Sequence, residues 1–459
     1  MITMGQSIRH YDNTQEASKE INVNCECIKK GETLGPKKGV VVVDTGNKLN
    51  VAEGLCDHHQ LCGEDAIKYS CAASIIQEKF EELKNYIDGF EEITVQGHEN
   101  PDPDCIASIY MVQYIAKYGK LPPNCESMVD YVGKVDQAKI KYDINNLDSV
   151  SLIMSVFSKT LNFKKGEDKN LKILENGFKL IEYVSERIYK IEKFTGEKIS
   201  WEDPRIFEVD HPYKTQVEFI KDDLRKYIAL VEKYTEADVK ALRLPLSSDI
   251  TKLSKKEFNI LDLGKLNGKK PMFLNMWASM HGYDGIMYNS AVNERGNNRI
   301  TQHISSICIN PDSADYDGKE VCLGHIGKVF EARDVAGRMY HKSKGGNLNG
   351  NEGLIPNSDN DTGVNRHGND GSATGYKFVI PGDAVPYDVV VELLNSYLKN
   401  PYNIGKNETE GLINNFYGVL SGEECLETSD KEKMQEDVDA TYQIPTDIAC
   451  DYHGIGYVC

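Results

Sequence analysis

Apolar residues in the first third of the chain form short unbroken runs that alternate with segments of helical spacing. The runs GVVVVDTG at 39–46 and EITVQGH at 92–98 are typical of buried parallel strands. Residues 64–87 and 104–118 place apolar positions at helical spacing behind acidic residues. This alternation predicts an α/β unit with a parallel sheet, in which ligands bind beyond the carboxyl ends of the strands.

The hydrophobic pattern changes twice further along the chain. Residues 171–194 and 214–234 have the spacing of long amphipathic helices, which favours a helical connector or insert. From about residue 257, strand-like runs return. The expected elements are strands at 258–263, 271–277 and 300–309, a helix at 331–343, a loop rich in Gly, Asn and Asp at 344–375, and a last strand and helix at 376–382 and 383–398.

The predicted fold class is therefore α/β, with a parallel-sheet N-terminal domain, a helical connector and a second, smaller α/β C-terminal domain. No internal repeat is found. The predicted parts are a loose or strand-adding extension at 1–38, the first α/β domain at 39–145, the helical connector at 146–256, the second α/β domain at 257–420 and an acidic tail at 421–459.

Charge and cysteine content restrict the function classes. The 459 residues include 71 Asp plus Glu against 53 Lys plus Arg, a formal net charge of −18. This balance argues against a protein that coats long nucleic acid, but bound metal ions could still supply positive charge for a phosphate substrate. No apolar run approaches the about 18 residues of a membrane span, and the start of the chain has no apolar signal core. The twelve Cys form no CxxC pair, so we expect a cytoplasmic protein with reduced thiols.

Three short segments concentrate residue types that bind metal ions. They are Asp44 at the end of the run VVVV, the triplet Asp57-His58-His59, and the motif H-x-x-P-D-x-D formed by His98, Asp102 and Asp104. A single Asp at a strand end more often caps a helix, but three such segments on one α/β pattern favour a site. Carboxylates with a few imidazoles suit Mn²⁺ or Mg²⁺. Two such ions about 3.5–4 Å apart can activate water and hold both ends of a phosphoryl displacement.

At these residues the chain resembles the DHH phosphoesterase family. GHENPDPDCIAS, through Ser108, is similar to the H-x-x-x-D-x-D segment of the family, and VVVVDTGNKLNVAEGLCDHHQ to its strand-end Asp and DHH triplet. The resemblance implies a DHH-like domain at 39–145 that binds two Mn²⁺, with Mg²⁺ as the alternative. The implied ligands are His98, Asp102 and Asp44 for one ion, and Asp104, Asp44, His58 and a later Asp for the other, with Asp44 bridging.

The resemblance leaves the later Asp and the strand order open. Asp136 in MVDYVGKVDQAK is our choice for this ligand, and Asp130 is its competitor. The resemblance also implies that His59 contacts the substrate phosphate and that Asp57 orients the neighbouring imidazoles. In the family the H-x-x-x-D-x-D segment comes first, whereas here it follows the DHH triplet. This order predicts a circular permutation or a rearranged sheet.

A second resemblance lies near the C-terminus. RDVAGRMYHKSKGG at 333–346 and RHGNDGSATGYKF at 366–378 are similar to the helix and the GGGHxxAxG-like segment of the family's C-terminal domain, with Asp370 where that segment has His. Gly-rich backbone can approach phosphate closely, and basic side chains add charge. The implied substrate-binding residues are Arg366, His367, Gly368, Gly371, Ser372, Ala373 and Gly375.

Together these features predict a Mn-dependent phosphohydrolase, a phosphodiesterase or phosphomonoesterase that acts by two-metal activation of water. The expected substrates are short oligonucleotides or small nucleotide phosphates. Long double-stranded nucleic acid and membranes are not expected partners, and a homodimer is left open. The alternatives are a single-strand exonuclease of the same family, an inorganic pyrophosphatase, and a non-catalytic nucleotide-binding sensor.

Overall fold

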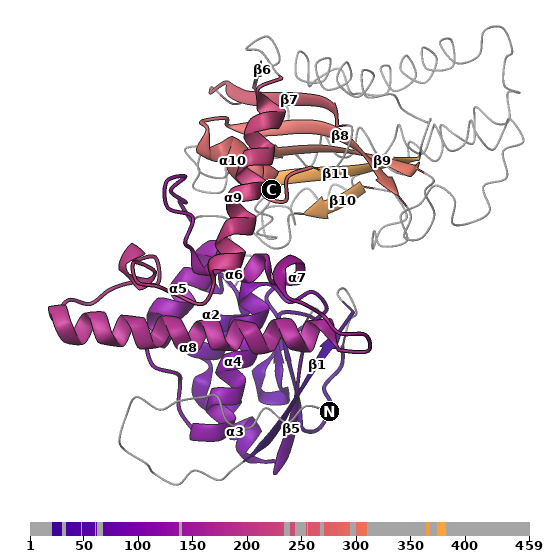
Figure 1. Cartoon of the computed structure of the whole chain (residues 1–459). Coiled ribbons are helices and arrows are strands. Elements are labelled where there is room, and N and C mark those ends of the chain that lie inside the picture. The colour runs from indigo at the N-terminus through magenta and orange to yellow at the C-terminus, as the bar shows by residue number, and fades with distance from the viewer. Residues whose placement is uncertain are drawn as a thin grey trace, which may run out of the picture. The chain divides into compact units, whose positions relative to one another are not determined.

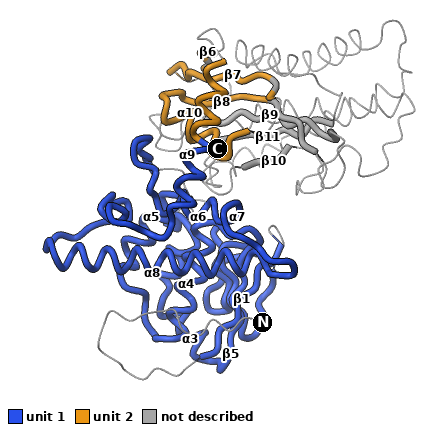
Figure 2. Tube along the Cα trace, viewed as in Figure 1, with its two compact units in different colours: residues 1–223 blue, residues 224–459 orange. Residues whose placement is uncertain are grey.

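The computed structural model divides the chain into two compact units, residues 1–223 and 224–459 (Figures 1 and 2). The structure describes residues 21–29, 34–46, 48–59, 61, 68–136, 140–233, 239–243, 254, 256–266, 270–293, 300–309, 364–367 and 374–381. Each unit is described here by itself. No helix among these residues is long and apolar enough to cross a membrane.

The first unit is built on a five-stranded sheet in the order β1-β5-β2-β4-β3. The strands are β1 (Asn22–Ile28), β2 (Val40–Val43), β3 (Leu49–Asn50), β4 (Leu55–Cys56) and β5 (Glu92–His98). All neighbouring pairs are parallel except β3 with β4. The two buried runs predicted as parallel strands are confirmed, because they form β2 and β5 side by side. The edge strand β1 lies in the predicted N-terminal extension, so that segment adds a strand to the sheet.

Helices and short 3-10 turns complete the first unit. They are η1 (Val51–Glu53), α2 (Ala72–Glu78), α3 (Phe80–Asp88), α4 (Pro103–Tyr118), α5 (Cys125–Asp136), α6 (Val150–Ser155), α7 (Phe157–Thr160), α8 (Lys169–Thr195), η2 (Pro204–Ile206) and α9 (Lys214–Val231), the last of which continues past residue 223. The predicted single helix at 64–87 is two helices, because the backbone leaves the helical conformation at Lys79.

Helix α4 forms the centre of the core. Every residue from Pro103 to Ala116 is buried, and the helix contacts β1, β2 and β5. Asp102 caps its start by accepting a hydrogen bond from the Cys105 N–H at 3.1 Å, and Gly119 ends it with φ 64°. Helix α8 packs against α4 and β1, so this part of the predicted connector belongs to the core of the first unit.

Gly97 of β5 permits a close approach between the sheet and α4. A Cβ atom at this position would lie 2.5 Å from Cys105 Sγ and 2.8 Å from Ile109 Cδ1. We expect Gly97→Val to lower the free energy of unfolding by about 1–3 kcal/mol, because a side chain there overpacks the core. Gly35→Val is the matched control, since no atom lies within 4 Å of a Cβ at that position. Urea unfolding of both variants checks the prediction, and equal midpoints would contradict it.

The second unit contains a six-stranded mixed sheet in the order β10-β11-β9-β8-β7-β6. Its strands are β6 (Val239–Leu242), β7 (Phe258–Leu266), β8 (Gly285–Asn293), β9 (Ile300–Ile309), β10 (Val364–His367) and β11 (Thr374–Pro381). Only the β7–β8 pair is parallel. Strand β6 falls within the predicted connector at 146–256, yet it pairs with β7 in this sheet.

Two predictions for the second unit were wrong. The run at 271–277 was expected as a strand, but α10 (Leu274–Met280) is a helix, because Leu274, Trp277 and Ala278 bury one face at helical spacing. The loop expected at 344–375 contains β10 and the first residues of β11, which pair as an antiparallel hairpin. The helices expected at 331–343 and 383–398 and the tail at 421–459 lie outside the described residues.

Candidate metal centre

One edge of the first sheet gathers the predicted ligands. Asp44 directly follows β2, Asp57 follows β4, and His98 is the last residue of β5. Since these three strands are parallel neighbours, their carboxyl ends meet at the same edge. Asp102 and Asp104 enter from the start of α4, and Asp136 is the last residue of α5. The chain order of the motifs therefore does not prevent their convergence.

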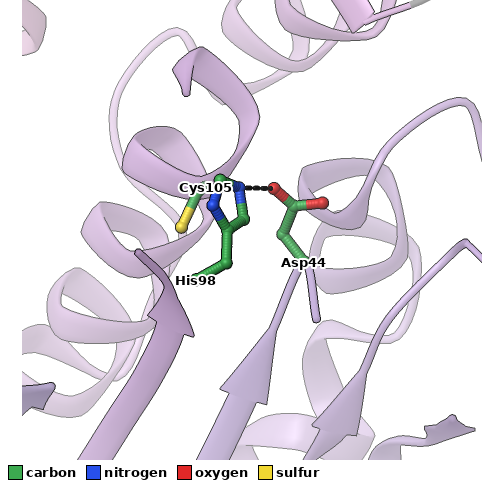
Figure 3. A group of neighbouring side chains, drawn as sticks. All are labelled: Asp44, His98 and Cys105. Atoms are coloured by element: carbon green, nitrogen blue, oxygen red, sulfur yellow. Dashed lines mark hydrogen bonds and ion pairs between the residues drawn. The ribbon is translucent and has the colours of Figure 1, made fainter. Parts of the chain in front are cut away.

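Asp44 lies at the centre of this edge. Its Oδ2 is 3.1 Å from Nε2 of His98 (Figure 3), while its Oδ1 is 3.3 Å from Nε2 of His58 and 3.7 Å from Nδ1 of His59. Asp44 has φ 54°, the left-handed region that is uncommon for residues other than Gly. Such a conformation often marks a functional constraint. One oxygen of this buried carboxylate thus faces His98, and the other faces His58 and His59.

The Oδ2 side of Asp44 carries the first predicted ligand set. His98 Nε2 also lies 3.1 Å from Oδ2 of Asp102. His98 Nδ1 is 2.9 Å from the carbonyl oxygen of Glu99. A proton on Nδ1 donated to that carbonyl fixes the ring tautomer and leaves the Nε2 lone pair for a metal ion. His98, Asp102 and Asp44 therefore lie within contact distance of one another.

The Oδ1 side of Asp44 carries the second set. His58 Nε2 lies 3.7 Å from both Asp104 Oδ2 and Asp136 Oδ2. The Asp104 carboxylate also accepts hydrogen bonds from the N–H groups of Ala72 and Ala73 at 2.7 and 3.0 Å. A carboxylate has about four acceptor sites, so these bonds leave Asp104 able to bind an ion. They also fix its orientation from the start of α2.

The structure distinguishes Asp136 from Asp130, the other candidate for the later ligand. The Asp136 side chain is 14% exposed and points to His58, whereas the Asp130 side chain is 59% exposed and pairs with Lys134 at 2.9 Å. Asp130 and Asp136 belong to the same helix, yet only Asp136 joins the cluster. The choice of Asp136 therefore has a geometric basis that the sequence alone lacked.

His59 and Asp57 form a pair beside the second set. The Nδ1 atom of His59 lies 2.7 Å from Oδ1 of Asp57, and Asp57 is buried. This contact holds the imidazole ring and leaves Nε2 as the nitrogen available to a substrate oxygen. Asp57 therefore contacts the ring of His59 directly.

The imidazoles of His58 and His98 have raised pKa values. Burial lowers the pKa of His58, but the carboxylates of Asp44 and Asp136 outweigh it and raise that pKa to about 10. Burial also lowers the pKa of His98, but the carboxylates of Asp102 and Asp44 outweigh it and raise that pKa to about 11. Protonated imidazoles therefore balance the carboxylates at neutral pH. Each imidazole must lose its Nε2 proton before that atom binds a metal ion.

Burial and neighbouring charges also shift the pKa values of the carboxylates in the cluster. Burial raises the pKa of Asp44, yet the neighbouring His58 and His98 hold it well below its usual range. Burial and the charge of Asp44 raise the pKa of Asp104 to about 7. Burial raises the pKa of Asp136 well above its usual range, with His58 opposing the rise. Packing several acids together in this way is unfavourable unless cations compensate for it.

Two buried polar atoms indicate that the donor set fits a divalent cation. Among the described residues, Asp136 Oδ2 makes no hydrogen bond, and His58 Nε2 has ion-pair contacts only, at 3.3 Å from Asp44 Oδ1 and 3.7 Å from Asp136 Oδ2. Buried polar atoms are nearly always satisfied, so unpaired ones need an explanation. A cation between them would satisfy both, and oxygen ligands with few imidazoles suit Mn²⁺ or Mg²⁺.

Cys105 lies beside the first set (Figure 3). Its Sγ and one ligand atom each of Asp44 and His98 lie within 4.8 Å of one another. Burial and the charge of Asp44 raise the pKa of the thiol well above its usual range. Its complete burial and the close approach to Gly97 are typical of a Cys that packs as a small apolar residue.

The predicted substrate-binding residues are only partly described. Arg366 and His367 lie on β10, where they pair with Tyr376 and Gly375 of β11. The structure therefore brings the two ends of the Gly-rich segment together as a hairpin. The remaining residues of this prediction lie outside the described residues, namely Gly368, Gly371, Ser372 and Ala373.

Comparisons of the chain with protein-family models, curated proteins and solved structures found no match. The resemblance to the DHH phosphoesterases therefore rests on the sequence motifs alone.

Proposed function

We propose that this chain is a DHH-like phosphohydrolase that uses two divalent cations, Mn²⁺ in preference to Mg²⁺. The supporting observation is the position of Asp44, whose two oxygens face His98 on one side and His58 on the other. A carboxylate shared between two ligand sets can hold two metal ions at the short separation that a two-metal site uses. His98 and Asp102 would complete one set, and His58, Asp104 and Asp136 the other.

Bound cations would lower the pKa of a coordinated water and neutralise charge on the phosphate. The residues of the chain have complementary tasks. Asp44 holds the two sets at a fixed separation, and the carbonyl of Glu99 keeps the proton of His98 on Nδ1. His59, held by Asp57, offers Nε2 to a phosphate or leaving-group oxygen.

The substrate we propose is a small phosphate ester, a short oligonucleotide or a nucleotide phosphate. The net charge of −18 disfavours a long polyanion lying across the surface. A single-strand exonuclease is the second candidate, because the same ligand set would serve it. The same ligand geometry could also be kept by a nucleotide sensor that binds without turnover.

A hydrolysis screen on the full chain tests this function. Dinucleotides, 3′,5′-bisphosphates, cyclic dinucleotides, pyrophosphate and long single-stranded DNA are each incubated with Mn²⁺, Mg²⁺ or EDTA. We expect phosphate-ester hydrolysis with Mn²⁺ on at least one small substrate, less on long DNA, and none in EDTA. Preferred turnover of long DNA would favour the exonuclease. Tight nucleotide binding with no turnover in any metal would contradict the enzyme and favour the sensor.

A further inference from the structure

The loop that joins β5 to α4 carries His98 and Asp102 and is held at two backbone points. The N–H of Glu99 donates to the carbonyl of Ile28 at 2.7 Å, which attaches the loop to the edge strand β1. The N–H of Asn100 donates to Oδ1 of Asn170 at 3.0 Å. The second partner comes from α8, 70 residues further along the chain.

The bond to Asn170 acts on the peptide group that contacts His98. The Glu99 carbonyl, which is 2.9 Å from His98 Nδ1, belongs to the same planar peptide as the Asn100 N–H. Holding the N–H of Asn100 therefore fixes the direction of the Glu99 carbonyl, which points the opposite way in the same plane. Asn100 has φ 56°, in the left-handed region that Asn adopts more often than most residues other than Gly.

Helix α8 is itself fixed at this end. Asp168 caps the helix and accepts hydrogen bonds from the N–H groups of Asn170 and Leu171 at 2.9 and 3.1 Å. Further along, Gly177 lets α8 approach α4 closely, since a Cβ there would lie 2.5 Å from Cγ2 of Ile106. Asn170 is thus presented by a helix whose position is set against the helix that carries the ligands.

We infer that Asn170 is a positioning residue for the first metal-ligand set. It orients the Glu99–Asn100 peptide, which fixes the tautomer of His98 and directs Nε2 toward Asp44 Oδ2. The role of Asn170 at a metal site rests on the proposed function. The restraint on the loop rests only on the hydrogen bonds that the N–H groups of Glu99 and Asn100 donate. Partners of this kind typically change metal affinity by about 10–100-fold when removed.

Three variants of the full chain test the inference. Asn170→Ala removes the acceptor, and Asn170→Asp retains an acceptor oxygen. Asn176→Ala is the matched control, because Asn176 is also half-buried on α8 and its side-chain amide donates a hydrogen bond to the carbonyl of Lys172 in the same helix. Mn²⁺ binding is measured by calorimetry, and amide hydrogen exchange of residues 98–102 is measured in EDTA.

We expect Asn170→Ala to weaken the binding of one of the two Mn²⁺ ions by about tenfold and to leave the affinity for the other unchanged. The loop should exchange faster in this variant, while Asn170→Asp and Asn176→Ala stay close to the wild type. Unchanged affinity for both ions in Asn170→Ala would overturn the inference and leave the proposed function standing. If the wild type binds no Mn²⁺, the proposed function fails. The amide hydrogen-exchange rates of residues 98–102 then test on their own whether Asn170 restrains the loop. Faster exchange then supports the restraint by Asn170, and unchanged exchange refutes it.

Discussion

Asp44→Asn is expected to abolish hydrolysis and to weaken the binding of both metal ions. Among the described residues, the oxygens of Asp44 face both ligand sets, at 3.1 Å from His98 Nε2 and 3.3 Å from His58 Nε2. An amide has the same shape but one fewer acceptor and no charge. The loss of activity should exceed the about hundredfold effect of changing a residue outside the ligand shell. Steady-state kinetics and equilibrium dialysis with Mn²⁺ measure the two effects.

The substitution at Asp44 should leave the backbone in place. The residue has φ 54°, and Asn adopts this left-handed conformation as readily as Asp. Circular dichroism in EDTA checks that the variant is folded. A folded Asp44→Asn chain that binds two Mn²⁺ and keeps wild-type turnover would show that Asp44 is not the bridging ligand.

Asp136→Asn is expected to remove one ion selectively. Asp136 Oδ2 is buried, has no hydrogen-bond partner in the part of the chain that the structure describes, and lies 3.7 Å from His58 Nε2. The ion on the His98 side uses other ligands, so it should remain bound. We expect stoichiometry to fall from about two ions to about one, with turnover lowered more than about a hundredfold because both ions are needed for in-line displacement.

Asp130→Asn is the matched control for this prediction. It makes the same chemical change on the same helix, but its carboxylate is exposed and pairs with Lys134. Such surface pairs contribute about 0–1 kcal/mol to stability. We therefore expect wild-type metal content and turnover from Asp130→Asn. The reverse result, with Asp130→Asn inactive and Asp136→Asn active, would assign the later ligand to Asp130.

The sequence was sufficient to place Asp44, Asp57 and His98 near one another, because each lies at the end of a buried strand. Runs such as VVVV before Asp44 have a clear signature, and parallel strands end at one edge of a sheet. The order of the strands was not predictable, since β3 and β4 have two residues each and show no periodicity. The sequence also could not separate Asp136 from Asp130, because helix packing decides which of them faces His58.

Long-range contacts account for the rest of what the sequence did not predict. Nothing near Asn170 in the chain indicates that it contacts Asn100, because the contact depends on how α8 packs on α4 at Gly177. The run at 271–277 was assigned to a strand because a short apolar run with aromatic residues has no decisive period. Tertiary burial of Leu274, Trp277 and Ala278 favours the helix instead.

The most direct test of the two-metal account is anomalous diffraction from crystals of the full chain grown with Mn²⁺. The account predicts two anomalous peaks about 3.5–4 Å apart on either side of the Asp44 carboxylate. One peak should contact His98 and Asp102, and the other His58 and Asp136. A fully Mn²⁺-loaded crystal with no peak at Asp44, or with a single ion there, would contradict the account.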